Sequence, residues 1–169
     1  MSMFLDIQTP SIPGESQSPN PNWNAKIEIE HFAYDISQST SQEAGTGLVS
    51  SGSRVGHIHI TKVMDKSSPL LFGLLCAGQP ITLMYFRVSQ PGAQGGSYGG
   101  LFEGETYQVG NVIVSSYHTS GAPGAGSLPR ETWAFSFTQM KETFQTVDIN
   151  GAMKAPVIAG RDFAKGTAL

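Results

Sequence analysis

The side chains best suited to chemistry are two histidines and two glutamates, each pair separated by a single residue. His57 precedes His59 and Glu103 precedes Glu105. In a β-strand both members of such a pair lie on one face, because side chains alternate between the two faces. Paired strand histidines can ligate zinc, and two carboxylates can hydrolyse glycosides. No cysteine or carboxylate cluster accompanies the histidines, so we expect two half-exposed histidines without a metal. We expect the two glutamates to lie at a solvated strand edge.

Other candidate catalytic motifs are incomplete. The glycine-rich run 95–100 lacks the Gly-Lys-Ser/Thr ending of a phosphate loop and precedes no predicted helix, which favours a flexible hairpin. The chain has no G-x-S-x-G nucleophile elbow, and Cys76 lies in an apolar stretch typical of a packing thiol. Trp133, Phe135 and Phe137 alternate as core residues do. The sequence therefore predicts no enzyme, no cofactor and no metal site.

The elements that must position these residues are mainly strands. Apolar residues recur with a period of two, which predicts strands at 4–7, 26–37, 55–64, 81–88, 101–117 and 131–139. The fifth strand is expected to break near Gly110, and the last is expected to continue through Phe144 and Val147. Residues 38–53 are rich in Ser, Thr and Gly and are predicted to form an extended loop. The apolar pattern fades in residues 150–169, which predicts a C-terminal tail ordered by a neighbour.

The second predicted strand changes its apolar face along its length. Ile27 and Ile29 define one parity, and the opposite parity follows in Phe32, Tyr34 and Ile36. A β-bulge shifts the register by one residue in this way, so we expect a bulge at His31 and all five apolar side chains in the core.

One helix of about nine residues is predicted at residues 69–77. Ser68 suits the N-cap, Pro69 the first helical position and Gly78 the position after the last turn. Asp65 and the serines are expected to satisfy the free N–H groups of the first turn. The segment is apolar nearly all round, which predicts burial on several sides and favours a second subunit as part of the cover.

Composition excludes several classes of protein. A length of 169 residues predicts one domain, 1–169. The net charge of −3 and the scattered basic residues argue against a nucleic-acid partner. No apolar run approaches the roughly 18 residues of a membrane span, and the first residues lack the basic and apolar regions of a cleaved signal peptide. Charged residues form only 14% of the chain against a usual share of about 25%, which suits a surface partly covered by neighbours.

Several runs of the sequence are similar to one family across almost the whole chain. The most specific is T-K-x-x-D-K-S-S-P at 61–69, with Cys76-Ala77-Gly78 after it. The turn Pro13-Gly14-Glu15-Ser16, the run 111–117 and the segment 129–131 fit the same pattern, whereas the tail lacks an expected tryptophan. These runs resemble the haemolysin-coregulated protein (Hcp) family, the tube-forming proteins of bacterial type VI secretion.

The resemblance implies a mainly β fold, an antiparallel barrel or sandwich of two sheets flanked by one short helix. It implies six-membered rings of identical chains that stack into a hollow tube. The implied partners are the chain itself, the spike, the sheath and baseplate, and small effector proteins in the lumen, with no membrane insertion. It also implies synthesis in the cytoplasm and secretion without a cleaved signal peptide.

Two sets of residues are assigned to the assembly as hypotheses. The face of segment 26–37 that points away from the core is predicted to line the lumen with small polar residues, namely His31, Ala33, Asp35 and Ser37. The alternative is that this face meets a neighbouring subunit. The loop 38–53 is predicted to reach the adjacent ring through Thr40, Glu43, Leu48 and Val49.

Three other functional classes compete with the tube subunit. A phage tail-tube protein shares the architecture by analogy only, and the 61–69 run favours the secretion family. A β-sandwich hydrolase would use the glutamate or histidine pair, and a ligand-binding barrel could act as a monomer.

Overall fold

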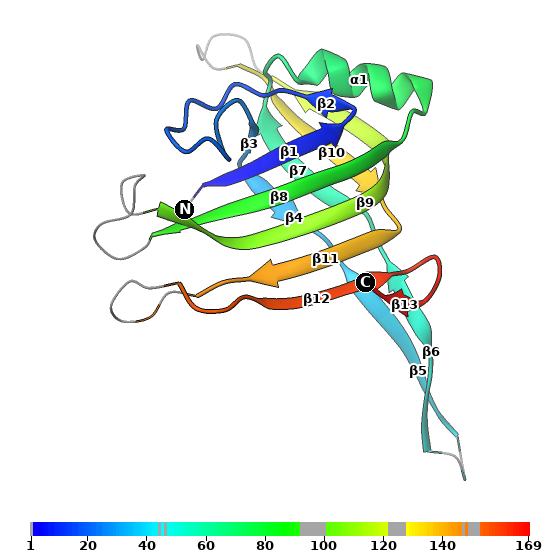
Figure 1. Ribbon diagram of the computed structural model, residues 1–169. Coiled ribbons are helices and arrows are strands. Elements are labelled where there is room, and N and C mark those ends of the chain that lie inside the picture. The colour runs from blue at the N-terminus through cyan, green and yellow to red at the C-terminus, as the bar shows by residue number, and fades with distance from the viewer. Residues whose placement is uncertain are drawn as a thin grey trace.

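The computed structural model describes residues 2–43, 45, 47–91, 101–121, 128–146, 148 and 153–169. These described residues form strands and one helix (Figure 1). In chain order the elements are β1 (Met3–Thr9), β2 (Ser11–Ile12), β3 (Ile27–Ile29), β4 (His31–Ala33), β5 (Ile36–Glu43), β6 (Gly47–Val55), β7 (Ile58–Val63), α1 (Ser68–Ala77), β8 (Ile81–Pro91), β9 (Leu101–Ser120), β10 (Arg130–Ser136), β11 (Gln139–Phe144), β12 (Val157–Asp162) and β13 (Thr167–Ala168). In the described part of the chain no helix is long and apolar enough to cross a membrane.

Two antiparallel sheets share the long strand β9. In the first sheet β9 lies between β8 and β11, with β1, β2 and β3 beyond β8 and β12 and β13 beyond β11. In the second sheet β9 pairs with β10, followed by β7 and β4. The expected two-sheet architecture with one flanking helix is therefore confirmed. In the described chain β3 pairs with β1 and β4 pairs with β7, but β3 and β4 do not pair with each other. The described strands therefore do not close into a continuous barrel.

The expected break in the 101–117 strand is a change of partner. β9 continues through Gly110, which pairs with Gln139 of β11, and Ile113 pairs with Ser136 of β10. Asn111 between them has a positive φ of 52°. β10 and β11 lie one after the other along β9, and both run antiparallel to it. The predicted continuation is confirmed as far as Phe144, with an interruption between the two strands, and Val147 lies outside the described residues.

The core lies between the two sheets. Trp133, Phe135 and Phe137 are buried there, as their alternation predicts. They meet buried aliphatic side chains from both sheets, including Leu5, Ile7, Ile27, Ile29, Ile58, Ile60, Met84 and Val109. Removal of such apolar surface from water contributes roughly 25 cal/mol per Å² to folding.

The parity change in segment 26–37 marks a passage from one sheet to the other. β3 pairs with β1 and β4 pairs with β7, and Glu30 joins them with its N–H 2.8 Å from the Thr61 carbonyl oxygen. The transition therefore lies at Glu30 rather than at the expected bulge at His31. Phe32 and Tyr34 pack against the core, but the prediction for the last apolar position is wrong, because Ile36 is 45% exposed.

The segment predicted as an extended loop is a β-hairpin that projects from the body (Figure 1). β5 and β6 pair along their lengths, with Ile36 opposite Val55 and Glu43 opposite Gly47. The turn uses Gly45 and Gly47 at positive φ, which glycine adopts without steric cost. Sequence periodicity did not indicate these strands because neither face is buried, so apolar residues do not alternate with polar ones.

The C-terminal tail is also more regular than predicted. β12 pairs with β11 along its whole length, and β13 folds back onto its end. The apolar pattern fades because this edge strand is open, with Val157 and Ile158 at 72% and 54% exposure. The turn after β12 is held by Asp162, whose carboxylate accepts hydrogen bonds from Gln139 and from the backbone N–H groups of Ala164 and Lys165.

The helix begins one residue earlier than predicted and ends at the predicted residue. Ser67, not Ser68, is the N-cap, and Gly78 ends the helix with φ 61° as predicted. Leu71 and Leu74 are buried on the body, whereas Leu70 and Phe72 are 47% and 50% exposed. Within the single chain α1 is thus covered on one side only (Figure 1).

Candidate functional site: a buried ion network and the surfaces around it

The 61–69 run encloses a buried ammonium group. The side chain of Lys62 is fully buried, at 0% exposure. Its Nζ lies 2.7 Å from Asp65 Oδ1 and 3.1 Å from Glu131 Oε2. The ammonium also donates to Ser68 Oγ at 2.8 Å and to the Val63 carbonyl oxygen at 3.1 Å. All these partners are oxygen acceptors, so the buried charge is compensated and its hydrogen bonds are satisfied.

Glu131 on β10 is the anionic centre of the same network. Ser68 Oγ donates to its carboxylate at 2.7 Å, Tyr117 Oη at 3.0 Å and Trp133 Nε1 at 3.2 Å. Burial by itself raises the pKa of Glu131, but the hydrogen bonds from Ser68 and Lys62 and the charge of Lys62 outweigh it. The pKa of this carboxyl therefore lies below its ordinary value, and Glu131 is ionised at neutral pH.

The network fastens the start of α1 to both neighbouring strands. Asp65 accepts a hydrogen bond from the Ser67 N–H at 3.0 Å, as predicted for a residue that satisfies the helix start. Ser68 has another role than the predicted cap, since its hydroxyl bridges Lys62 and Glu131. The most specific run of the sequence therefore serves a structural purpose. Sequence reasoning missed the partner carboxylate because Ser68 and Glu131 are 63 positions apart.

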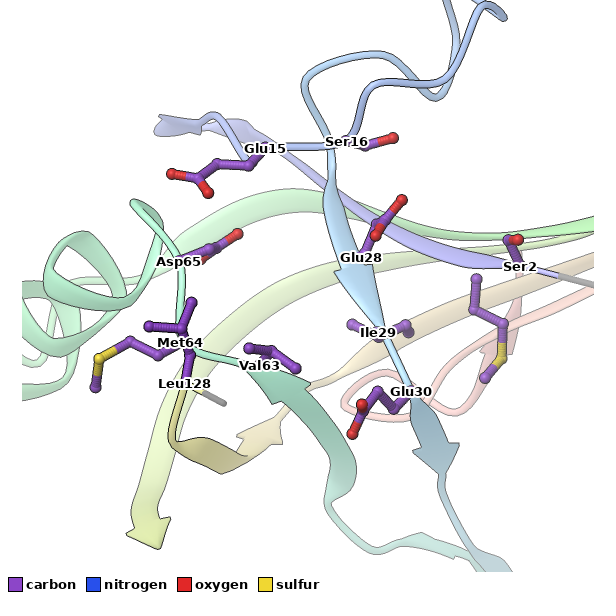
Figure 2. Close-up of a pocket in the computed structure, with 11 residues that line it drawn as sticks. Ser2, Glu15, Ser16, Glu28, Ile29, Glu30, Val63, Met64, Asp65 and Leu128 are labelled. Carbon is purple, nitrogen blue, oxygen red and sulfur yellow. The ribbon is translucent and has the colours of Figure 1, made fainter. Parts of the chain in front are cut away.

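A pocket of about 570 Å³ opens beside this network (Figure 2). Its walls combine carboxylates with apolar side chains, and it is lined by Ser2, Met3, Glu15, Ser16, Glu28, Ile29, Glu30, Val63, Met64, Asp65 and Leu128. Glu30 is already paired with Arg130 at 3.0 Å, and Glu15 accepts the Lys66 N–H at 3.2 Å. The chemistry of this pocket suits a cationic or amide group on an apolar stem.

The histidine and glutamate pairs considered in the sequence analysis gather no third metal-ligating group within the described residues. His57 and His59 are exposed, with ring centroids 6.2 Å apart, and the described residues contain no group of three or more metal-ligating side chains. Glu105 accepts a hydrogen bond from Tyr107 Oη at 2.6 Å. The side chain of Glu103 and the run 95–100 lie outside the described residues.

Two of the predicted lumen residues lie on β4 of the second sheet, whereas Asp35 precedes the hairpin and Ser37 belongs to its strand β5. His31 and Ala33 alternate on β4, and Asp35 and Ser37 follow with the same spacing. All four are exposed, and the residue between the first two, Phe32, packs against the core.

The predicted stacking residues lie on the projecting hairpin. Thr40 is exposed on β5, and Leu48 and Val49 on β6 are 75% and 41% exposed. Glu43 is placed at the end of β5, but its side chain lies outside the described residues.

Comparison with solved structures shows the fold. A structure described as that of a type six secretion system protein has a TM-score of 0.84 and 24% identity, with 99% of each chain covered. Hcp1 from Salmonella typhimurium has a TM-score of 0.75 and 23% identity, with 99% of this chain and 98% of that chain covered. A type VI secretion system effector from Yersinia pestis has a TM-score of 0.69 and 23% identity, with 95% and 98% covered.

Comparison of the sequence itself shows the family. A search of curated proteins finds no match. The family model "Type VI secretion system effector, Hcp" matches residues 4–144, which include the buried network and every predicted lumen and stacking residue. The chain therefore belongs to the Hcp family, and it is a tube subunit of a type VI secretion system.

Proposed function

We propose that six copies of this one-domain chain form a ring, and that the rings stack into a tube exported through the contractile secretion apparatus. The observation that carries the proposal is the hairpin β5–β6. Each of its strands pairs with the other and with no further described strand. A lone two-stranded hairpin is marginally stable in water, so a neighbouring copy is the natural support for it.

Exposed apolar side chains support the same proposal. Phe72 and Leu70 project from α1, and Ile113 on β9 is 46% exposed. A ring is a head-to-tail assembly, in which two different surfaces of each chain meet. Burial of these side chains at such contacts would stabilise the ring and remove them from water.

The hairpin is assigned to contacts between rings. We propose that Thr40, Glu43, Leu48 and Val49 reach the adjacent ring. Replacement of residues 40–50 by an Asn-Gly turn, which suits a two-residue hairpin, is expected to leave rings intact and to stop tube growth. Electron microscopy and light scattering provide the two readouts. Tubes of normal length from the shortened protein would contradict this assignment.

The exposed face of β4 is assigned to the lumen. We propose that His31, Ala33, Asp35 and Ser37 line the channel and hold small effector proteins weakly, which allows their release. Asp35→Arg or Ala33→Arg is expected to lower co-purified effector while rings persist, because a bulky cation narrows the channel. Lys154→Glu, at an exposed position outside this face, is the matched control. Loss of rings in the Arg variants would instead place this face at a subunit contact.

A further inference from the structure

The four histidines of the chain come from three separate stretches of sequence and gather on one face of the second sheet. The register places His31 opposite Thr61, Thr61 opposite Thr132, and Thr132 opposite His118. Directly paired residues on neighbouring strands project from the same face of a sheet. His31 on β4 and His118 on β9 therefore lie at the two ends of one cross-strand row.

Of the other two histidines, His59 belongs to the neighbouring row, and His57 lies just before the start of β7. His59 on β7 is paired with Ala33 on one side and Ala134 on the other, and Ala134 is paired with Ser116. His57 precedes His59 by two residues, and their ring centroids are 6.2 Å apart. Small side chains beside His59 leave its imidazole open to solvent. We name His31, His57, His59 and His118 the histidine face.

The histidine face points away from the core. Ile60 and Trp133, whose parity on β7 and β10 is opposite to that of the histidine face, are fully buried. All four histidines are exposed. The predicted lumen residues His31 and Ala33 lie on this same face.

The fixed charges around the histidine face balance. Asp35 follows β4 with the spacing of this face, and Arg54 stands opposite Ser37 at the base of the hairpin. Arg130, at the start of β10, is paired with Glu30 at 3.0 Å. These groups contribute two negative and two positive charges, so the protonation of the histidines decides the sign of the face.

Histidine is the side chain that ordinarily changes charge between about pH 5 and 8. The formal charge of the chain is −3 with its four histidines neutral. Four added protons bring this −3 to +1, and every one of the added charges lies on the histidine face. Protonation of the four histidines alone would therefore change the formal charge of the chain from negative to positive, and it would do so on one surface.

We propose that the histidine face is an acid-dependent binding surface for anionic protein partners. With neutral imidazoles the face is polar and nearly uncharged, and with protonated imidazoles it is cationic and attracts acidic surfaces. This inference deepens the proposed function and rests on it for one point, since a ring with these strands inward places the histidine face in the channel. Cargo retention then follows the pH around the tube.

A polyaspartate peptide labelled with a fluorophore is the probe for this surface. Aspartate carboxylates stay ionised at pH 5.5, because their ordinary pKa is about 3.9. We expect fluorescence anisotropy to show binding at pH 5.5 that is at least about tenfold weaker at pH 7.5, as for other contacts between opposite charges. Higher salt should weaken the binding at pH 5.5.

Variants separate the histidines from other effects of acid. The fourfold variant H31Q/H57Q/H59Q/H118Q should lose the binding at pH 5.5, whereas H31K/H59K should bind at both pH values. Lys154→Gln with Lys165→Gln, which removes two exposed cations outside the face, is the matched control and should bind as the unaltered protein does. Circular dichroism and light scattering verify that each variant folds and assembles equally.

The outcomes distinguish this inference from the proposed function. Equal binding by the fourfold variant, or no binding by the unaltered protein at pH 5.5, overturns the inference, even if rings form. A chain that stays monomeric but binds polyaspartate only through its histidines supports the inference and contradicts the ring.

Discussion

Lys62 and Glu131 place two opposite charges in the interior of a small β fold. Both side chains are fully buried, and their charged atoms lie 3.1 Å apart. The attraction within such a pair roughly offsets the cost of removing its charges from water, so the pair is retained for reasons other than net stability. Here it defines where the helix start docks, because Ser68 donates to one charge and accepts from the other.

Removal of one charge should be severely destabilising. Lys62→Met is expected to cost about 3–5 kcal/mol, because Glu131 then remains buried without a cation. The double variant K62M/E131Q should recover part of this loss, since Gln carries no charge and still accepts hydrogen bonds. Urea unfolding of the three proteins at equal concentration measures the difference. A double variant as unstable as the single one would contradict the role of charge.

The pH dependence of stability follows from the pKa of Glu131. The carboxyl binds a proton less readily in the folded than in the unfolded chain, because its folded pKa is lowered. Its contribution to stability is therefore complete above the unfolded value, which is ordinarily about 4.3, and is lost as the pH falls through the folded pKa. Thermal unfolding between pH 3 and 7 should show this loss, and Glu131→Gln should reduce it. An unchanged acid profile in E131Q would exclude this cause.

For single residues, the sequence predicted where a residue lies in an element better than which residue of another element it contacts. Asp65 was predicted at the helix start and lies there, but the contact between Lys62 and Glu131 depends on register between β7 and β10. In the same way His31 and His118 come to lie in one row only after four strands have paired. Spacing along the chain carries no signal for contacts of this kind.

Among the elements, those with one buried face were predictable and those with none were not. The alternation of Trp133, Phe135 and Phe137 predicted β10, and Gly78 predicted the end of α1. The hairpin β5–β6 and strand β12 have no apolar alternation, because both faces of the hairpin and the edge of β12 stand in solvent. Their regularity comes from backbone pairing, which constrains side chains little.

The turn before β3 depends on a glycine. An added Cβ at Gly14 would lie 2.2 Å from the Lys26 carbonyl oxygen and 2.3 Å from the Ile27 nitrogen. Gly14→Ala must therefore displace backbone, and we expect a loss of about 1–3 kcal/mol in the free energy of unfolding.

A second glycine provides the matched control for this change. Gly73 lies within α1, and no atom stands within 4 Å of an added Cβ. Gly73→Ala should raise stability by about 0.5–1 kcal/mol, because alanine loses less backbone freedom in a helix. Chemical unfolding of both variants provides the comparison. Equal effects at the two sites would contradict the close approach at Gly14.

At the scale of the whole molecule, the exposed apolar side chains and the low charge are those expected of a chain whose surfaces are partly buried by other copies of itself. Charged residues are few, the outer side of α1 is apolar, and the hairpin has no partner strand within the described chain. An isolated subunit exposes these features together, whereas the proposed head-to-tail ring would cover them and still leave one face of the second sheet open. Sequence composition indicated covered surfaces, but only the fold shows which surfaces they are.

Light scattering after size-exclusion chromatography, over a range of protein concentrations, tests self-assembly most directly. The proposed ring predicts a particle near six times the chain mass of 18.0 kDa, with ring-shaped images in the electron microscope. A single species with the mass of one chain at the highest concentration, and no rings in the images, would contradict the account.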